Sequence, residues 1–336
     1  MAIIKTIHFF KMLLSNKSPQ SIIETTNLQI TENLSLKTDI YLPRKKYAGT
    51  ILFFHGMNKY GKDDERVKKL CASFAVIGYR VIVPNYALIM NHIWDPISVD
   101  EFEETILSLC ANNALCPTGK LAIFTASLSG TLALFACGRP ATQNKVTSFL
   151  TIGSGFQVKD IFVVGLSNPH YDRYTKLICA KALMHHAKVY NQNLMKGISI
   201  AIDDAFRKDN ENRFNKYLPL LSTKDQQELK SIVEDDNLDW LYNKHKEVLS
   251  KQEQKLFNSG DYKLLTMPVI LIHSLSDVVF PPIESRRTAE KLEKAGANCR
   301  LVITSLLDHV DHNISWHNIT EAFNLFCAFY YFFKNI

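Results

Sequence analysis

The 336-residue sequence contains no apolar run near the roughly 18 residues that a membrane-spanning helix needs. Its seven cysteines are odd in number and show no paired spacing, so we do not expect a disulfide framework. The 39 Lys and Arg residues exceed the 33 Asp and Glu residues, but the basic ones are scattered, which argues against nucleic-acid binding. No internal repeat or low-complexity tract is visible. These absences leave an ordinary globular chain with 46% hydrophobic residues.

The first residues, MAIIKTIHFFKMLLS, are apolar and basic. They differ from a cleavable signal peptide, because Lys5, His8 and Lys11 interrupt the apolar region and no small-x-small site follows. We expect an amphipathic helix that packs on the body, with contact to a membrane surface as the alternative. Thiols in apolar segments fit a reducing compartment. We therefore expect a cytoplasmic protein, with signal-less export as the alternative.

Short apolar runs alternate with helical patterns along much of the chain. Runs of this kind are typical of strands that are covered on both faces of a parallel sheet. The patterns predict two strands in 27–42 and single strands in 50–56, 79–86, 120–127, 145–155, 267–274 and 299–306. They predict helices at 64–77, 99–112, 130–137, 282–295 and 316–334. The alternation predicts an α/β fold with a doubly wound, mostly parallel sheet.

The alternation stops after residue 156. Residues 157–262 show helical periods and many polar residues, and a segment of about a hundred residues is too long for a plain loop. We expect a helical cap, inserted at the edge of the sheet where α/β proteins bind ligands. The predicted division is an N-terminal extension (1–26), a core in two parts (27–156 and 265–336) and the cap (157–264).

Three residues with complementary chemistry follow predicted strands: Ser127, Asp277 and His309. The carboxyl ends of parallel strands meet at one edge of the sheet. A serine needs a base to become a nucleophile, and histidine has a suitable pKa. A carboxylate on the other ring nitrogen fixes the tautomer of the histidine. The sequence therefore predicts a catalytic triad, in the order serine, acid, histidine.

Four motifs resemble those of the α/β-hydrolase superfamily, which uses the same order. They are HGMN (55–58) for the turn after the third strand, FTASLSG (124–130) for the nucleophile elbow, SLSDVVFPP (274–282) for the acid loop and LLDHV (306–310) for the histidine loop. Residues 61–86 also resemble the stretch after the HG turn in bacterial esterase-like members. The resemblance covers 27–156 and 265–336 but not the cap. It implies a serine hydrolase that needs no metal or organic cofactor.

The elbow departs from the family pattern G-x-S-x-G. Thr125 and Ser129 stand where the glycines are usual, and Gly130 follows one position later. Glycine is usual there because side chains two residues before and after the serine collide at the sharp turn. The β-branched Thr125 is the main departure. Ser127 is the expected nucleophile; the alternatives are Ser129 and a serine that only caps a helix.

The resemblance implies an oxyanion hole made by the backbone N–H groups of Met57 and Leu128. Gly56 would let the main chain approach the substrate, and His55 is expected to be a structural hydrogen-bonding residue. Asp160 is the alternative acid.

The run DHVDH (308–312) offers a second histidine, His312, as the alternative base. The same run is also an alternative metal cluster, since it places His and Asp side chains close together.

The predicted activity is cleavage of a carboxylic ester or thioester through an acyl-enzyme. The cap suggests an acyl-chain or lipid substrate by analogy. The alternatives are peptidase or acyltransferase chemistry on the same triad, and a hydrolase-fold protein that binds a ligand without turnover. The expected partner is a small-molecule or lipid ester, without nucleic acid. Peripheral membrane contact through the N-terminal helix or the cap is a further alternative.

Overall fold

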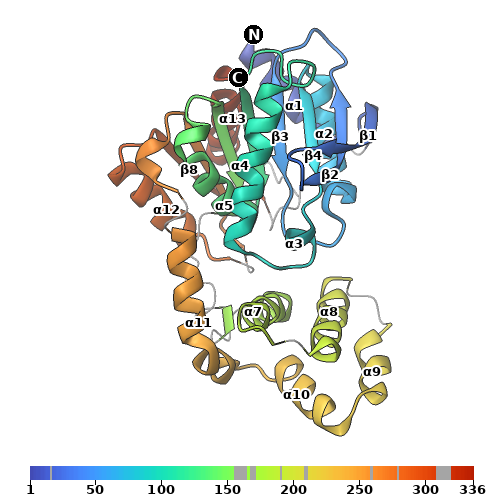
Figure 1. Ribbon diagram of the computed structural model, residues 1–336. Helices are drawn as coiled ribbons and strands as arrows, with labels where there is room; N and C mark the ends of the chain where they lie inside the picture. The colour runs from blue at the N-terminus through green and yellow to red at the C-terminus, as the bar shows by residue number, and fades with distance from the viewer. Residues whose placement is uncertain are drawn as a thin grey trace. The chain divides into compact units, whose positions relative to one another are not determined.

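The computed structural model describes residues 1–15, 17–154, 165–166, 172–189, 191–207, 211–257, 260–277, 280–307 and 319–336, without the side chains of 252, 253 and 257. The chain divides into two compact units (Figure 1). The first comprises Met1–Asn91, Asp95–Phe156 and Leu256–Ile336, and the second His92–Trp94 and Gln157–Lys255. The domain boundaries expected from the sequence stay a prediction.

The first unit is built on an eight-stranded sheet with the order β1-β2-β4-β3-β5-β6-β7-β8. The strands are β1 (Ile22–Gln29), β2 (Ser35–Leu42), β3 (Thr50–Phe54), β4 (Arg80–Pro84), β5 (Leu121–Ala126), β6 (Val146–Ile152), β7 (Val269–Ser274) and β8 (Cys299–Thr304). β2 pairs antiparallel with β1 and β4, and the other neighbours are parallel. The predicted mostly parallel sheet is confirmed.

Helices of the first unit flank this sheet (Figure 1). They are α1 (Ala2–Leu13), α2 (Glu65–Val76), α3 (Ala87–Met90), α4 (Pro96–Ala111), α5 (Leu128–Cys137), α12 (Ile283–Lys294) and α13 (Ile319–Lys334), with short 3-10 turns at Gly61–Asp63, Pro140–Thr142 and Tyr262–Leu264.

Neighbouring residues of β3 show how the two faces are covered, because successive side chains of a strand point to opposite faces. Phe53 stacks on Phe124, which contacts Phe74 of α2 edge to face. Phe54 stacks on Phe102 of α4, with ring centroids 4.0 Å apart. The cluster that contains Phe53 also includes buried residues of α1 and α13, so one face of the sheet is covered by α1, α2 and α13 and the other by α4. The parallel strands between these layers end at a common edge.

The second unit is helical in its described residues. It contains α7 (Arg173–His186), α8 (Gln192–Arg207), α9 (Arg213–Tyr217), a 3-10 turn at Leu218–Leu220, α10 (Thr223–Val233) and α11 (Asp239–Phe257), which continues into the first unit. Its core includes Leu183, Ile198 and Leu229, all fully buried. In the described part of the two units, no helix is both long enough and apolar enough to cross a membrane.

Candidate active site

Ser127 stands at the junction of β5 and α5. Its φ of 57° and ψ of −146° are a conformation that residues other than glycine rarely adopt. The Ser127 N–H donates to the carbonyl of Ile152 in β6 (2.8 Å), and the Ser127 carbonyl accepts from the N–H of Gly130 (3.0 Å). A single strained serine therefore joins strand to helix, which is the backbone geometry of a nucleophile elbow.

The second serine of the motif has a different environment. Ser129 is fully buried, and its hydroxyl donates to the carbonyl of His55 at 2.5 Å. This bond fastens the start of α5 to the turn after β3. Ser127 is only half-buried. The arrangement favours Ser127 over Ser129 as the nucleophile, because a nucleophile must reach the substrate.

Thr125 fits the elbow without distorting it. The residue continues β5, lies opposite Phe54 and Thr151 in the neighbouring strands, and is fully buried. Its hydroxyl has no hydrogen-bond partner within the described part of the chain. Threonine in place of glycine therefore leaves a buried hydroxyl without a partner among the described residues, which lowers stability. Ser127 still adopts its positive φ.

Gly130 is the glycine that this elbow requires. A Cβ atom at this position would lie 2.3 Å from both Ser154 Oγ and Thr151 Oγ1. These two hydroxyls are hydrogen-bonded to each other at the end of β6. The absence of a side chain at Gly130 lets α5 pack directly on that pair.

The turn after β3 lies against the serine. A Cβ atom added to Gly56 would be 3.4 Å from Ser127 Cβ. The N–H of Asn58 donates to the Gly56 carbonyl (2.9 Å), which tightens the turn around Met57. Leu128 is the first residue of α5, and the first N–H groups of a helix have no acceptor within it. The two amides expected to form the oxyanion hole therefore belong to segments that meet at Ser127.

His55 has the structural role expected from the sequence. Its Nδ1 donates to the carbonyl of Gly56 (2.9 Å), and its Nε2 accepts from the N–H of Tyr86 (3.4 Å). Burial lowers the pKa of His55 to about 4, although the bond to Gly56 and the charge of Asp64 oppose this shift. The imidazole is therefore neutral near pH 7 and holds the turn in place.

A buried ion pair anchors the far end of the same loop. Lys62 Nζ lies 3.0 Å from Asp39 Oδ1 in β2 and 2.9 Å from Asp63 Oδ1. Burial acts to lower the pKa of Lys62, but the hydrogen bonds to Asp63 and Asp39 raise it overall. The loop that carries Met57 is thus tied to the sheet at Lys62.

Asp277 follows β7 and is almost fully buried. Its Oδ1 accepts from the N–H of Phe280 (2.9 Å), and its Oδ2 lies 3.3 Å from Nε2 of His273. The same Nε2 lies 3.0 Å from the carbonyl of Phe280. Because both of these partners are acceptors, Nε2 must carry a hydrogen. The imidazole of His273 therefore donates toward the carboxylate and toward the loop that follows it.

His273 extends into a buried polar chain that the sequence did not reveal. Its Nδ1 lies 2.6 Å from Oγ of Ser285 in α12. The Ser285 hydroxyl donates to the carbonyl of Ser154, and the Ser154 hydroxyl bonds Thr151. Hydrogen bonds thus connect the acid loop after β7 to the residues on which Gly130 packs. A histidine inside an otherwise apolar strand was the available signal.

His309, the expected base, lies outside the described residues, as do His312 and Asp160. Both ends of the segment that contains the two histidines are well anchored. Before it, the Ser274 hydroxyl at the end of β7 donates to the carbonyl of Leu307. After it, Glu321 of α13 accepts from the Ser305 N–H (2.5 Å) and hydroxyl (2.8 Å). Leu307, the last described residue before this segment, thus lies beside the end of β7, the strand that Asp277 follows.

The metal alternative concerns the DHVDH run (308–312). No three His, Cys, Asp or Glu side chains in the described ranges gather in a way that could hold a metal ion. The DHVDH run falls outside those ranges.

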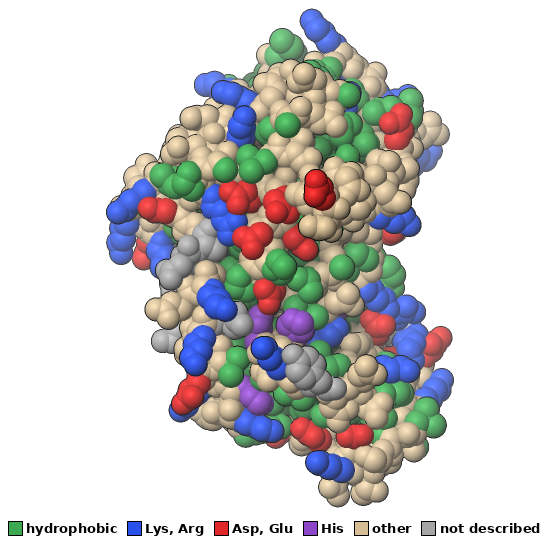
Figure 2. All heavy atoms as spheres, viewed as in Figure 1, with side chains coloured by type: hydrophobic (Ala, Val, Ile, Leu, Met, Phe, Trp, Pro, Cys, Tyr) green, Lys and Arg blue, Asp and Glu red, His purple; other side chains and the backbone are tan. Residues whose placement is uncertain are grey.

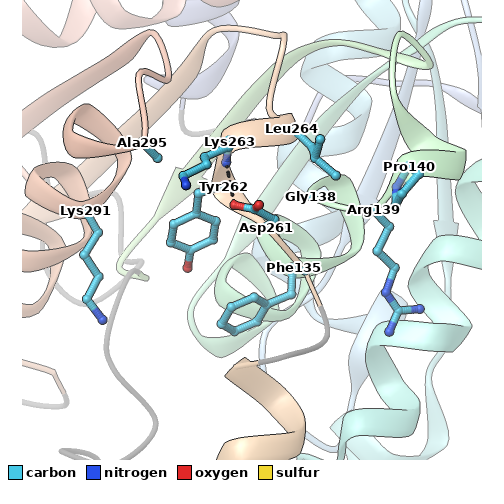
Figure 3. A pocket seen from close by; sticks show the side chains of 11 residues that line it. Phe135, Gly138, Arg139, Pro140, Asp261, Tyr262, Lys263, Leu264, Lys291 and Ala295 are labelled. Carbon is cyan, nitrogen blue, oxygen red and sulfur yellow. Dashed lines mark hydrogen bonds between the residues drawn. The ribbon is translucent and has the colours of Figure 1, made fainter.

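A separate hollow of about 680 Å³ lies at the other end of α5 (Figure 3). Phe135 and Tyr262 stack in it with centroids 5.6 Å apart, and Asp261 accepts from the N–H of Lys263 (2.9 Å). A helix rises about 1.5 Å per residue, so the eight residues from Ser127 to Phe135 span about 12 Å. This hollow is therefore distinct from the elbow.

Solved structures share this fold at low sequence identity. The chain matches an acylaminoacyl peptidase with a TM-score of 0.52 and 15% identity, over 95% of this chain and 42% of that one. It matches bacterial brefeldin A esterase with a TM-score of 0.53 and 12% identity, over 98% and 84% of the two chains. It matches Candida antarctica lipase A in its closed state with a TM-score of 0.53 and 14% identity, over 92% and 76%.

The chain thus spans about two fifths of the length of the peptidase and most of the length of the esterase and the lipase. By sequence, no family model and no curated protein matches it. The sheet order, the positive-φ serine between β5 and α5 and these structural matches agree with the resemblance seen in the sequence. The chain has the α/β-hydrolase fold.

Proposed function

We propose that the protein is a serine hydrolase that cleaves a carboxylic ester or thioester through an acyl-enzyme. The observation that carries this proposal is the positive φ of Ser127 between β5 and α5. A strained residue persists only where its surroundings hold it, and such residues cluster at functional sites. This one is a serine at the carboxyl edge of the sheet, where α/β proteins bind ligands.

In the proposed reaction, His309 takes the proton of Ser127 while Oγ attacks the carbonyl carbon of the substrate. The N–H groups of Met57 and Leu128 donate to the oxygen that becomes negative. The intermediate collapses as His309 gives the proton to the leaving alcohol or thiol, and an ester bond to Ser127 remains. Water then attacks this ester with His309 again as base, which releases the acid and restores the serine.

Asp277 would hold His309 in the tautomer that accepts the serine proton. Its Oδ1 atom accepts from the N–H of Phe280, and its Oδ2 atom lies 3.3 Å from Nε2 of His273.

A serine-reactive fluorophosphonate tests the proposal directly. We expect the purified protein to be labelled, Ser127→Ala to lose labelling and Ser129→Ala to retain it. Labelling of Ser127→Ala at the wild-type rate would refute the assignment. Failure of the wild type to label would favour the rival, a hydrolase-fold protein that binds a ligand without turnover. His309→Ala and His312→Ala, compared in the same assay, identify the base.

Two observations bear on the substrate class. The helical second unit and the lipase among the similar structures favour an acyl-chain or lipid ester, whereas the peptidase among them favours an acylated peptide. Rates on nitrophenyl esters of increasing chain length, compared with an acylaminoacyl anilide, separate the two. A higher kcat/KM on the anilide would overturn the ester assignment.

We also propose a cytoplasmic location. All seven cysteines are free thiols, and five of them are buried. A reducing compartment keeps such thiols from forming disulfides. Thiol trapping in cells that make the protein should find the cysteines reduced. A sizeable fraction of disulfide-bonded protein would contradict the proposal.

A further inference from the structure

Helix α1 presents two contrasting faces. On one face, Phe9 stacks on Phe74 of α2 and on Phe329 of α13, each with centroids 4.8 Å apart. Phe9 is fully buried, as is Thr6 on the same face. This packing fixes the rotation of α1 about its own axis, so the opposite face is presented to the surroundings in a defined way.

That opposite face is apolar as well. Ile3, Ile4 and Ile7 are 52%, 56% and 54% exposed. Their spacing places them together on one turn, since residues three and four apart are neighbours on a helix. Single exposed apolar residues are ordinary, but three grouped aliphatic ones are not. Isoleucine also has a lower helix propensity than Lys, Glu or Ala, so helix formation does not explain the choice.

The charged side chains of the N-terminal segment that contains these isoleucines have one sign. Lys11 and Lys17 are exposed. No Asp or Glu occurs in the first 23 residues of the sequence, which include three lysines. Elsewhere acidic side chains are plentiful: Figure 2 shows them gathered on the face that carries α4, where Arg139 pairs with Asp100 and Glu103. The apolar face of α1 therefore belongs to a basic segment of the chain, whereas the charges of the whole sequence are mixed.

A small hollow adjoins the same helix. It measures about 430 Å³ and is lined by residues from the start of α1 and the end of α13, among them Ile3, Lys5, Tyr330 and Lys334. Lys5 is held there by its bond to the Tyr79 hydroxyl (3.2 Å). Lys5, Lys334 and Tyr330 thus lie beside the exposed Ile3. Basic and aromatic side chains next to apolar ones are typical of protein surfaces that contact lipid headgroups.

We propose that α1 docks on a membrane surface that contains anionic phospholipid. Ile3, Ile4 and Ile7 enter the boundary between headgroups and acyl chains, while the exposed Lys11, Lys17 and Lys334 face the phosphates. A second copy of the chain fits less well. A two-fold interface would bring this basic surface against itself, without acidic residues from the same segment to compensate. This inference is independent of the proposed catalytic activity.

Vesicle co-sedimentation tests the proposal. The full chain is mixed with phosphatidylcholine vesicles, with or without phosphatidylglycerol. We expect binding to the anionic vesicles that weakens with added salt. The triple substitution Ile3→Ser, Ile4→Ser and Ile7→Ser should weaken it by at least about tenfold. The matched control is Ile22→Ser with Ile23→Ser in β1, where the side chains are 63% and 45% exposed, and it should bind as the wild type does.

Because all five positions are exposed, both variants should fold, which far-UV circular dichroism checks. The proposal is overturned if the wild type does not bind anionic vesicles, or if the β1 control loses as much binding as the triple variant. It is also overturned if sedimentation equilibrium shows a wild-type dimer that the triple substitution dissociates, because a second copy would then be the occupant.

Discussion

The Nε2 atom of His273 lies 3.3 Å from Oδ2 of Asp277, and both side chains are buried. The two residues are four positions apart, at the end of β7 and in the loop that follows. His273 also bonds Ser285 of α12 through its other nitrogen. Asp277 is proposed to orient the catalytic histidine, His309. Its carboxylate therefore lies beside a different histidine, His273, which Ser285 holds in place.

We predict that His273→Leu lowers kcat by about tenfold and leaves KM nearly unchanged, because His273 lies behind Asp277 and orients it. His273→Gln, which keeps a side-chain N–H donor, should recover most of the loss. Steady-state kinetics on a short nitrophenyl ester measure both values. Equal activity of the two variants at matched thermal stability would contradict a positioning role.

His273 could not be recognised as a site residue from the sequence, for a physical reason. In VILIHSLS it sits among apolar residues and has the pattern of one more buried strand position. Its function depends on Asp277, Phe280 and Ser285, which only the fold brings to it. The spacing of strands along the chain does not show which side chains of the loops and helices will contact a given strand residue.

The order of strands and helices, in contrast, could be predicted well. The runs at 50–56, 79–86 and 120–127 became β3, β4 and β5 within two residues at each end. These strands are covered on both faces, so their composition alone marks them. The sequence predicts that the first strand begins at 27, but β1 begins at Ile22. It is an exposed edge strand without a buried apolar face, so its first residues lack the alternating pattern that marks a strand in the sequence.

Part of the elbow could be predicted from the sequence and part could not. The sequence predicts Ser127 between a strand and a helix, and the structure has it there, while its role as nucleophile stays a prediction. Whether Thr125 would distort the turn depended on packing that local sequence does not encode. The fold tolerates Thr125 and relies instead on Gly130, where a Cβ atom would meet the Ser154–Thr151 pair.

Gly130→Ala should therefore destabilise the protein by about 1–3 kcal/mol, despite the better helix propensity of alanine. The matched control is Gly197→Ala in α8, where the two nearest atoms are the terminal methyl carbons of Leu229, the far end of a flexible side chain rather than a hydrogen-bonded pair of hydroxyls. Urea denaturation measures both. A loss for Gly197→Ala that equals or exceeds the loss for Gly130→Ala would show that the contact with β6 is not the cause.

Thr125→Val removes a buried hydroxyl that has no partner among the described residues, and it keeps the shape of the side chain. We predict a gain in unfolding free energy of about 1 kcal/mol and unchanged fluorophosphonate labelling. The matched control is Thr38→Val in β2, where the equally buried hydroxyl donates to the Leu36 carbonyl at 2.8 Å.

The Thr38→Val variant should lose about 1 kcal/mol, because its substitution breaks a hydrogen bond. If Thr125→Val also loses stability, the Thr125 hydroxyl has a partner in solution. If it gains stability but loses labelling, the threonine contributes to catalysis rather than merely fitting the turn.

The depressed pKa of His55 makes the stability of the sheet unit depend on pH. The pKa is about 4 in the native state and 6.5 in the unfolded chain. Between these values the unfolded chain binds a proton that the native protein does not, so stability rises with pH through this window and falls on acidification. From pH 7 to pH 5 the expected loss from this group is about 2 kcal/mol. His55→Gln should abolish this part of the pH dependence, which urea denaturation of both proteins at the two pH values measures. Equal losses in the two proteins would mean that His55 is not the group whose protonation opposes folding.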